Sequence, residues 1–181
     1  MRIIAGRWRG RPLLAPPGSA TRPTADRVRE ALFSMLTSRL GSFEGLQVAD
    51  LFAGSGALGL EALSRGAAHC TFVEKDRQAL EILRRNIDRL GAGERADVRA
   101  QAVEHVSPGP CDLILMDPPY GQGLAQPALD RLHRLGWIGA GTWIALETAH
   151  DEKVQVKALE IETERKVGKA KLNLLRVAAS A

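Results

Sequence analysis

Cysteine, long apolar runs and clusters of metal ligands are all scarce in this sequence. Its two cysteines, Cys70 and Cys111, lie in or beside apolar stretches and form no CxxC pair, which argues against a disulfide framework and a zinc site. The four histidines are scattered without the spacing of metal ligands. We therefore expect structural thiols and no metal.

No apolar run approaches the roughly 20 residues that cross a bilayer. The opening stretch MRIIAGRWRG is too basic, and its apolar part too short, for a signal peptide. We expect a cytoplasmic protein without membrane contact. The 181 residues, of which 45% are hydrophobic, suffice for one ordinary domain with its own core and a short extension.

Acidic residues are almost absent from the start of the chain, where Asp26 is the only acid up to residue 29 and seven arginines occur. The net charge of +4 and the pI near 9.4 hint at a polyanionic ligand, but the distribution of charge matters more than its total. A change of composition predicts a basic arm over residues 1–23 and a second unit over residues 24–181. Residues 2–6 and 10–15 of the arm are predicted to pair as a small hairpin.

Beyond the arm, apolar stretches alternate with helical patterns. The predicted strands cover residues 46–52, 70–74, 97–102, 112–117 and 142–147. The predicted helices cover residues 57–66, 76–91 and 124–136, and an earlier one opens at residues 23–24. Apolar strands separated by helices indicate an α/β fold with a mostly parallel, doubly wound sheet. Residues 158–178 alternate with period two around Val167-Gly168-Lys169, which predicts an antiparallel hairpin.

A glycine-rich turn, DLFAGSGALGLEAL, follows the first predicted strand. Gly54, Gly56 and Gly59 match GxGxxG at a strand-to-helix turn, where backbone can approach a ligand and the helix start offers free N–H groups. Glu74 ends the second predicted strand, where a carboxylate can accept bonds from the ribose hydroxyls of a nucleotide-like cofactor. The alternatives are glycines needed only for packing and an acid that caps the next helix.

Asp50 distinguishes between two cofactors for this turn. A nicotinamide dinucleotide would place its pyrophosphate at the helix start, where the nearby Asp50 carboxylate would repel it. S-adenosylmethionine would instead offer its amino group to Asp50. The turn therefore favours a methyltransferase over a dehydrogenase.

Asp117-Pro118-Pro119-Tyr120 follows the fourth predicted strand and cannot continue it, because proline lacks a backbone N–H. The motif therefore emerges at the same sheet edge as the glycine turn. The Asp117 carboxylate and the Pro118 carbonyl can accept both N–H bonds of an exocyclic amine, and Tyr120 can stack on the base. Such a clamp localises the amine lone pair and aims it at a sulfonium methyl, so these four residues form the predicted catalytic site. The alternative is a proline-rich turn with a buried tyrosine.

The motifs resemble one family along nearly the whole chain: RIIAGRWRGRPL, RPTADRVREALFSML, DLFAGSGALGLEALSRGA, FVEKD and MDPPY. The motif DPPY after a glycine turn is similar to the amino-methyltransferases of DNA and RNA, and the full set resembles the bacterial RsmD family of 16S ribosomal RNA guanine-N2 methyltransferases. The resemblance implies a Rossmann-like class I methyltransferase fold with seven strands and an N-terminal basic β-hairpin. It also implies S-adenosylmethionine as the methyl donor and one guanine of the small subunit, or of its assembly intermediate, as the target.

Carried over to this chain, the resemblance implies cofactor contacts at Asp50, Gly54, Ser55, Gly56, Glu74, Lys75, Gln101 and Ala102. The family usually has an acid and an alanine where this chain has Gln101 and Ala102, and glutamine can still hydrogen-bond adenine. The arm fits a contact to RNA phosphates with one stacking platform. The predicted RNA-binding residues are Arg2, Arg7, Trp8, Arg9, Arg11 and Arg22. The alternative for the arm is a solvated basic face with Trp8 covering the core.

Two other functions compete with this interpretation. A DNA adenine-N6 methyltransferase shares the clamp but generally needs further residues to read and flip a base in a duplex, and this chain has no second domain for that task. A non-catalytic RNA-binding assembly factor would keep the fold without binding S-adenosylmethionine. A small enzyme with a large partner is most simply a monomer.

Overall fold

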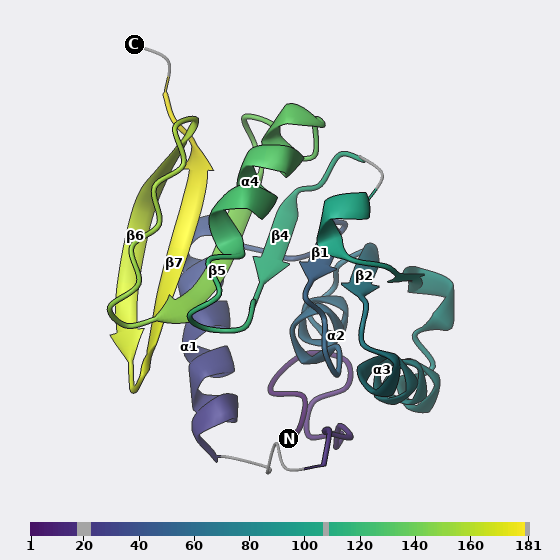
Figure 1. Cartoon of the computed structure of the whole chain (residues 1–181). Helices are drawn as coiled ribbons and strands as arrows, with labels where there is room; N and C mark the ends of the chain where they lie inside the picture. The colour runs from purple at the N-terminus through teal and green to yellow at the C-terminus, as the bar shows by residue number, and fades with distance from the viewer. Residues whose placement is uncertain (18–22, 107–108, 180–181) are drawn as a thin grey trace.

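The computed structural model describes residues 1–17, 23–106 and 109–179, which form one sheet with helices on both faces (Figure 1). The strands are β1 Gln47–Leu51, β2 His69–Glu74, β3 Ala96–Ala100, β4 Leu113–Met116, β5 Trp143–Ala149, β6 Leu159–Val167 and β7 Ala170–Val177. The α-helices are α1 Pro23–Leu40, α2 Ala57–Ser64, α3 Arg77–Leu90 and α4 Ala125–Arg134. Two short 3₁₀ helices, η1 Gly93–Arg95 and η2 Val103–His105, flank β3. Of the helices in these ranges, none is long and apolar enough to cross a membrane.

The sheet has the strand order β3-β2-β1-β4-β5-β7-β6. Strands β1 to β5 run parallel, and β7 is inserted antiparallel between β5 and β6. The predicted class I methyltransferase sheet and its antiparallel C-terminal hairpin are thereby confirmed. The chain leaves β1 toward β2 on one side and later returns to β4 on the other, and ligands of such sheets bind outside the carboxyl ends of these strands.

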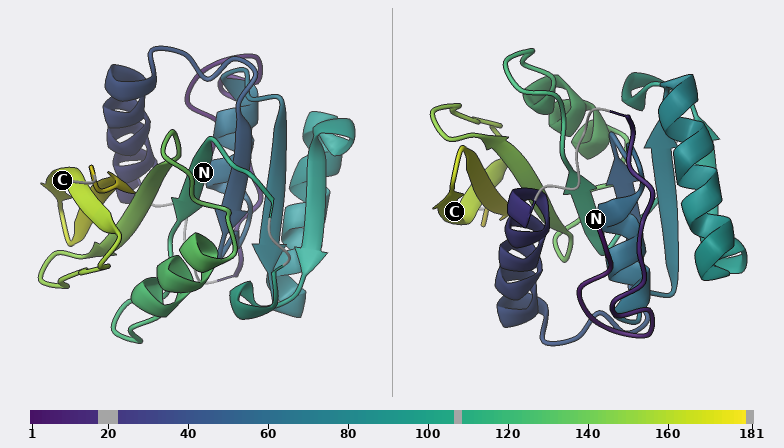
Figure 2. Two further views of the ribbon diagram at one scale, coloured as in Figure 1. Left: turned by 90° about the horizontal axis from the view of Figure 1, so that it is seen from above. Right: turned by 90° about the horizontal axis from the view of Figure 1, so that it is seen from below.

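Alternate residues of the strands enter two hydrophobic cores. In β4, Leu113 and Leu115 belong to the core under α1, α2 and α3, whereas Ile114 and Met116 belong to the core under α4. Figure 2 shows α1 and α4 on opposite faces of the sheet. Helices on both faces explain why β4 is apolar at every position, as expected for a central parallel strand.

The N-terminal arm folds back on itself and packs against α2 and α3. The predicted hairpin is present as a single antiparallel bridge between Arg2 and Pro12 rather than as two regular strands. Ile3, Trp8 and Leu13 are buried in the same core as α1 to α3. These residues are therefore fixed to the body of the protein. The predicted boundary between the arm and the second unit, at residues 23–24, stays a prediction.

Buried polar side chains of α2 and α3 hold the backbone of the arm. Glu61 accepts hydrogen bonds from the Ile4 and Ala5 N–H groups at 2.8 and 3.1 Å. Ser64 accepts a bond from the Trp8 N–H at 3.0 Å. Asn86 accepts from an N–H of the arm, at Leu14, and donates to the carbonyls of Leu14 and Ser55. Asn86 thus links the arm to the glycine turn.

Candidate functional site

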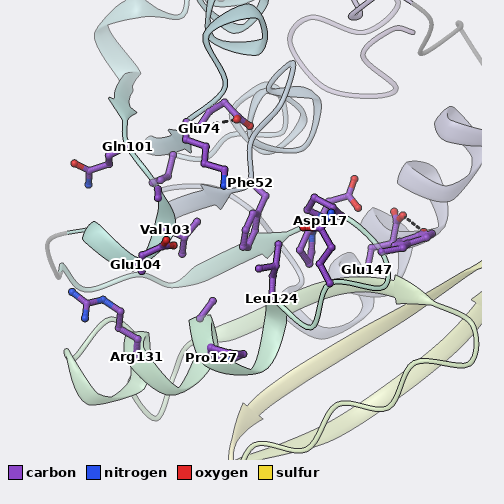
Figure 3. A pocket seen from close by; sticks show the side chains of 18 residues that line it. Phe52, Glu74, Gln101, Val103, Glu104, Asp117, Leu124, Pro127, Arg131 and Glu147 are labelled. Carbon is purple, nitrogen blue, oxygen red and sulfur yellow. Dashed lines mark hydrogen bonds between the residues drawn. The ribbon is translucent and has the colours of Figure 1, made fainter.

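Two adjoining cavities lie at the carboxyl edge of the sheet. The larger, of about 950 Å³, extends from the ends of β2 and β3 to α4 (Figure 3) and has the size of a small-molecule site. The smaller, of about 750 Å³, lies between the glycine turn, α1 and the β6–β7 turn. Four residues line both cavities: Phe52, Asp117, Tyr120 and Glu147. The structure thus brings the predicted catalytic motif to the junction of two spaces.

The predicted cofactor residues are divided between these cavities. The larger one contains Glu74, Lys75, Gln101 and Ala102, and the smaller one contains Asp50, Gly54 and Ser55. Gly56 is buried at the N-cap of α2 and lines neither cavity.

Each glycine of the turn meets a steric requirement. Gly54 and Gly56 have φ angles of 57° and 86°, which L side chains rarely adopt. A Cβ on Gly59 would stand 2.4 Å from the Phe72 ring and 2.7 Å from the Cys70 sulfur. The third glycine therefore serves the close packing of α2 on β2, whereas the first shapes a cavity wall.

Glu74 connects the glycine turn to the end of β2. Its Oε1 accepts a hydrogen bond from the Gly54 N–H at 2.8 Å, and its Oε2 accepts bonds from the Lys75 and Asp76 N–H groups at 3.0 and 2.8 Å. The helix α3 is capped by Asp76, which accepts from the Ala79 N–H. Because a carboxylate offers about four acceptor positions, Glu74 can hold the turn and still accept a ligand hydroxyl.

Asp50 is buried at the end of β1 and accepts a hydrogen bond from the Gly59 N–H at 2.9 Å. Burial raises the pKa of Asp50 well above its ordinary value, the Gly59 N–H lowers it, and the charges of Asp117 and Glu74 raise it further. These three acids line the two cavities, and acidic side chains there disfavour a pyrophosphate.

The Asp117-Pro118-Pro119-Tyr120 motif opens into both cavities. Pro118 is buried, whereas Asp117 and Pro119 are exposed and Tyr120 keeps 43% of its surface accessible. The alternative of a buried tyrosine is therefore wrong, and an aromatic face is available for stacking.

Glu147, which lies in β5 two residues before its last residue, is a site residue that sequence reasoning missed. The Tyr120 hydroxyl donates a hydrogen bond to the Glu147 Oε2 at 2.5 Å. Burial raises the pKa of the Tyr120 hydroxyl, and the hydrogen bond to Glu147 raises it further. The available signal was an acid that ends the fifth predicted strand, just as Asp117 ends the fourth.

Asp117 interacts directly with Glu147. Although Asp117 is exposed to the open cleft, protein atoms crowd its carboxylate, and this desolvation, followed by the charge and hydrogen bond of Glu147, raises the pKa of Asp117 to about 8.

Phe52 is the second site residue that sequence reasoning missed. It is the only non-glycine with a positive φ among the described residues, at 60°. Its ring stands between Glu74 and Asp117 in Figure 3. A bulky residue with a positive φ stores backbone strain, and here that strain lies at the wall between the two cavities.

The arm residues predicted to bind RNA have different environments. Arg2, Arg7, Arg9 and Arg11 are exposed, and Arg11 donates to the Arg89 carbonyl at the end of α3 at 2.5 Å. Arg22 lies outside the described residues.

The proposed stacking role of Trp8 is corrected by its burial. Trp8 is only 7% exposed, and the Arg95 guanidinium lies 5.2 Å from its ring centroid. The alternative that Trp8 covers the core therefore holds, because a buried ring offers no face to a base.

No group of three or more histidine, cysteine or acidic side chains in the described ranges could hold a metal ion. Cys70 is buried and Cys111 half-buried, and burial raises the pKa of both thiols. The absence of a metal stays a prediction.

Residues 1–176 match the family model described as "Conserved hypothetical protein 95". The chain is 41% identical over 150 residues to Ribosomal RNA small subunit methyltransferase D of Escherichia coli K12, covering 82% of this chain and 74% of that protein. It is 35% identical to Putative rRNA methyltransferase YlbH of Bacillus subtilis, covering 86% and 85%. The solved structure of the putative methyltransferase yhhF from Escherichia coli superposes with a TM-score of 0.86 at 36% identity and covers 99% of each chain.

Proposed function

We propose a specific reaction for this chain, which belongs to the Conserved hypothetical protein 95 family, the RsmD methyltransferases. The proposed reaction is methylation of the N2 amine of one guanine in small-subunit ribosomal RNA. S-adenosylmethionine is the proposed donor and supplies a methyl group on a positively charged sulfur. The relatives' names support the RNA substrate.

One observation carries this proposal: the Asp117-Pro118-Pro119-Tyr120 motif stands at the junction of the two cavities that together contain most of the predicted cofactor residues. The larger cavity has the acid Glu74 for ribose hydroxyls, with Gln101 and Ala102 further along for adenine. The smaller one has Asp50 for an amino group. The acids at the junction match a cationic sulfur and favour S-adenosylmethionine over a nicotinamide dinucleotide.

The residues at the junction position a poor nucleophile. The Asp117 carboxylate and the Pro118 carbonyl accept the two N–H bonds of the guanine amine, and Tyr120 stacks on the ring. The bound donor would supply the methyl group: the amine nitrogen would form the bond to the methyl carbon, the sulfur would keep the electrons of the bond that breaks, and the methylated amine would then release one proton to solvent. Catalysis consists chiefly of positioning and of the negative field that stabilises positive charge on the amine.

The arm is the proposed contact to RNA phosphates through Arg2, Arg7, Arg9 and Arg11, which are exposed on one folded segment. Arg22 remains a predicted contact, and the enzyme is proposed to act as a cytoplasmic monomer on the small subunit or its assembly intermediate. Buried acceptors hold the arm backbone, so that backbone needs little further ordering when RNA binds.

The test is incubation with labelled S-adenosylmethionine and, separately, unmodified small subunits, their naked RNA and duplex DNA, followed by nucleoside analysis. N2-methylguanosine from subunits or RNA is the expected product. N6-methyladenine in DNA would keep the clamp but overturn the substrate. Absence of both transfer and cofactor binding would favour the non-catalytic assembly factor.

A further inference from the structure

Glu147 stands beside Asp117 because of the register of two parallel strands. Met116 at the end of β4 pairs with Leu146 of β5. The residues that follow them, Asp117 just after β4 and Glu147 within β5, therefore lie at the same level. Adjacent strands are about 4.8 Å apart, and residues at one level point to the same face. In Figure 3 the labelled Asp117 and Glu147 accordingly lie together on one side of the cleft.

No cation in the described part of the chain forms an ion pair with either acid, since the ion pairs formed there involve Asp26, Glu61 and Asp97. Tyr120 donates to one oxygen of Glu147, and no hydrogen bond to Asp117 from another side chain or a backbone N–H of the described residues accompanies it. Both carboxylates therefore keep unused acceptor positions at the junction of the cavities. Adjacent acids with unused acceptor positions and no cationic partner are typical of a site whose ligand supplies the missing donors.

Guanine supplies donors that match this pair. On its Watson–Crick edge the N1–H stands next to the N2 amine, so two neighbouring atoms offer three N–H bonds. In adenine and cytosine the ring nitrogen next to the amine carries a lone pair instead. A second carboxylate beside the amine clamp therefore attracts guanine and repels the other two bases.

We infer that Glu147 is a specificity-determining residue that accepts the N1–H of the target guanine while Asp117 and the Pro118 carbonyl hold its N2 amine. The inference rests on the proposed function and names the group that selects the base. The guanine N–H groups supply the donors that the two acids lack, and the Tyr120 hydroxyl occupies one oxygen of the Glu147 carboxylate. A base that presents a lone pair at N1 would leave Glu147 unpaired and repelled, which costs more than the loss of a neutral hydrogen bond.

The test uses small subunits reconstituted with RNA that carries either guanine or 2-aminopurine at the target position. 2-Aminopurine keeps the amine at the same ring position but has a lone pair at N1. Wild-type protein is expected to prefer guanine by about 100-fold or more in kcat/KM. Glu147→Gln should reduce this ratio to below about tenfold, because its amide can donate to N1.

Two control variants separate recognition from a merely structural role. Glu147→Asp keeps a carboxylate and should retain a high guanine preference even if turnover falls. Tyr120→Phe removes the bond to Glu147 but leaves its charge, so it should slow both substrates together and leave the ratio high.

Three results would overturn the inference alone, given transfer to guanine by the wild type: a wild-type ratio near one, an unchanged ratio in Glu147→Gln, or the same loss of ratio in Tyr120→Phe as in Glu147→Gln. Absence of transfer to guanine by folded wild-type protein would instead overturn the proposed function, and the inference with it. Thermal unfolding of each variant shows whether a lost activity reflects a lost fold.

Discussion

The acids under the arm and the acids at the sheet edge are held in opposite ways. Glu61 is fully buried, yet it accepts bonds from two backbone N–H groups of the arm and from Arg65 at 2.9 Å, and Arg29 lies 3.7 Å away. Asp117 and Glu147 border open cavities, yet among the described residues they interact only with Tyr120 and with each other.

The difference separates a structural network from a binding site. A buried carboxylate with donors on all sides holds two segments in one arrangement and has little left to offer a ligand. A pair of acids that lacks donors costs free energy in the unliganded protein, and a ligand with N–H groups can recover it. Removing the first kind of acid should damage the fold, whereas removing the second should damage activity.

The largest effect is expected for Glu61→Ala. This change leaves the Ile4 and Ala5 N–H groups and Arg65 without their buried acceptor, and we expect a loss of about 3–5 kcal/mol in the free energy of unfolding. Urea denaturation measures it, with Glu81→Ala on the exposed face of α3 as the matched control. Equal midpoints for the two variants would show that the arm does not depend on Glu61.

Asp117→Ala should lower turnover by about 10²–10³-fold, because it removes one acceptor of the amine clamp. Affinity for S-adenosylmethionine should change far less. Single-turnover methyl transfer and calorimetry of cofactor binding measure the two effects, with Asp130→Ala on α4 as the control. Equal loss in both would place Asp117 in the cofactor pocket rather than in the clamp.

Replacing Arg7, Arg9 and Arg11 by alanine should weaken RNA binding and reduce its dependence on salt. Loss of three phosphate contacts lowers the slope of log affinity against log salt concentration by about 2. Titrations at several salt concentrations measure the slope. The control replaces three exposed arginines of other elements, Arg39, Arg134 and Arg165, and an identical slope in both triple variants would remove the arm from the RNA interface.

The smallest effect is expected in the stability of Asp117→Asn. The pKa of Asp117 lies at about 8 in the folded protein against an ordinary 3.8, so folding takes up a proton between these values. The contribution of this proton to the stability of the wild type is therefore full below the lower value and is lost as pH rises through the upper one.

Asp117→Asn lacks this loss and should gain stability relative to the wild type from about pH 5 to about pH 9. Melting temperatures across that range measure the gain, and Asp130→Asn should show none. A difference in melting temperature between Asp117→Asn and the wild type that stays constant with pH would mean that Asp117 is not crowded by its neighbours in the absence of ligand.

Local patterns in the sequence were enough for most of the fold. The strands, the helices of the body and the C-terminal hairpin follow from apolar runs, helical spacing and period-two alternation, which depend on nearby residues. The glycine turn and the Asp117-Pro118-Pro119-Tyr120 motif could also be predicted from local sequence, because glycine frees the backbone and proline restricts it whatever surrounds them.

Contacts between distant segments could not be predicted in this way. Trp8 was assigned to RNA because its neighbours in sequence are arginines, whereas packing against the body buried it. Nothing in the local sequence shows that Glu61 accepts hydrogen bonds from the arm, which lies 57 and 56 residues away in the chain. Asn86 showed no sign that it joins the arm to Ser55, which lies 31 residues away in the chain.

The sequence by itself determined the order of the elements, the glycine turn and the acid that ends β4, because each depends on short-range sterics and periodicity. Only the tertiary structure decided that Glu147 stands beside that acid, since the pairing of Met116 with Leu146 is a property of the β4–β5 register. It also decided which acids have donors and which do not, because hydrogen-bond partners come from segments that only folding brings together.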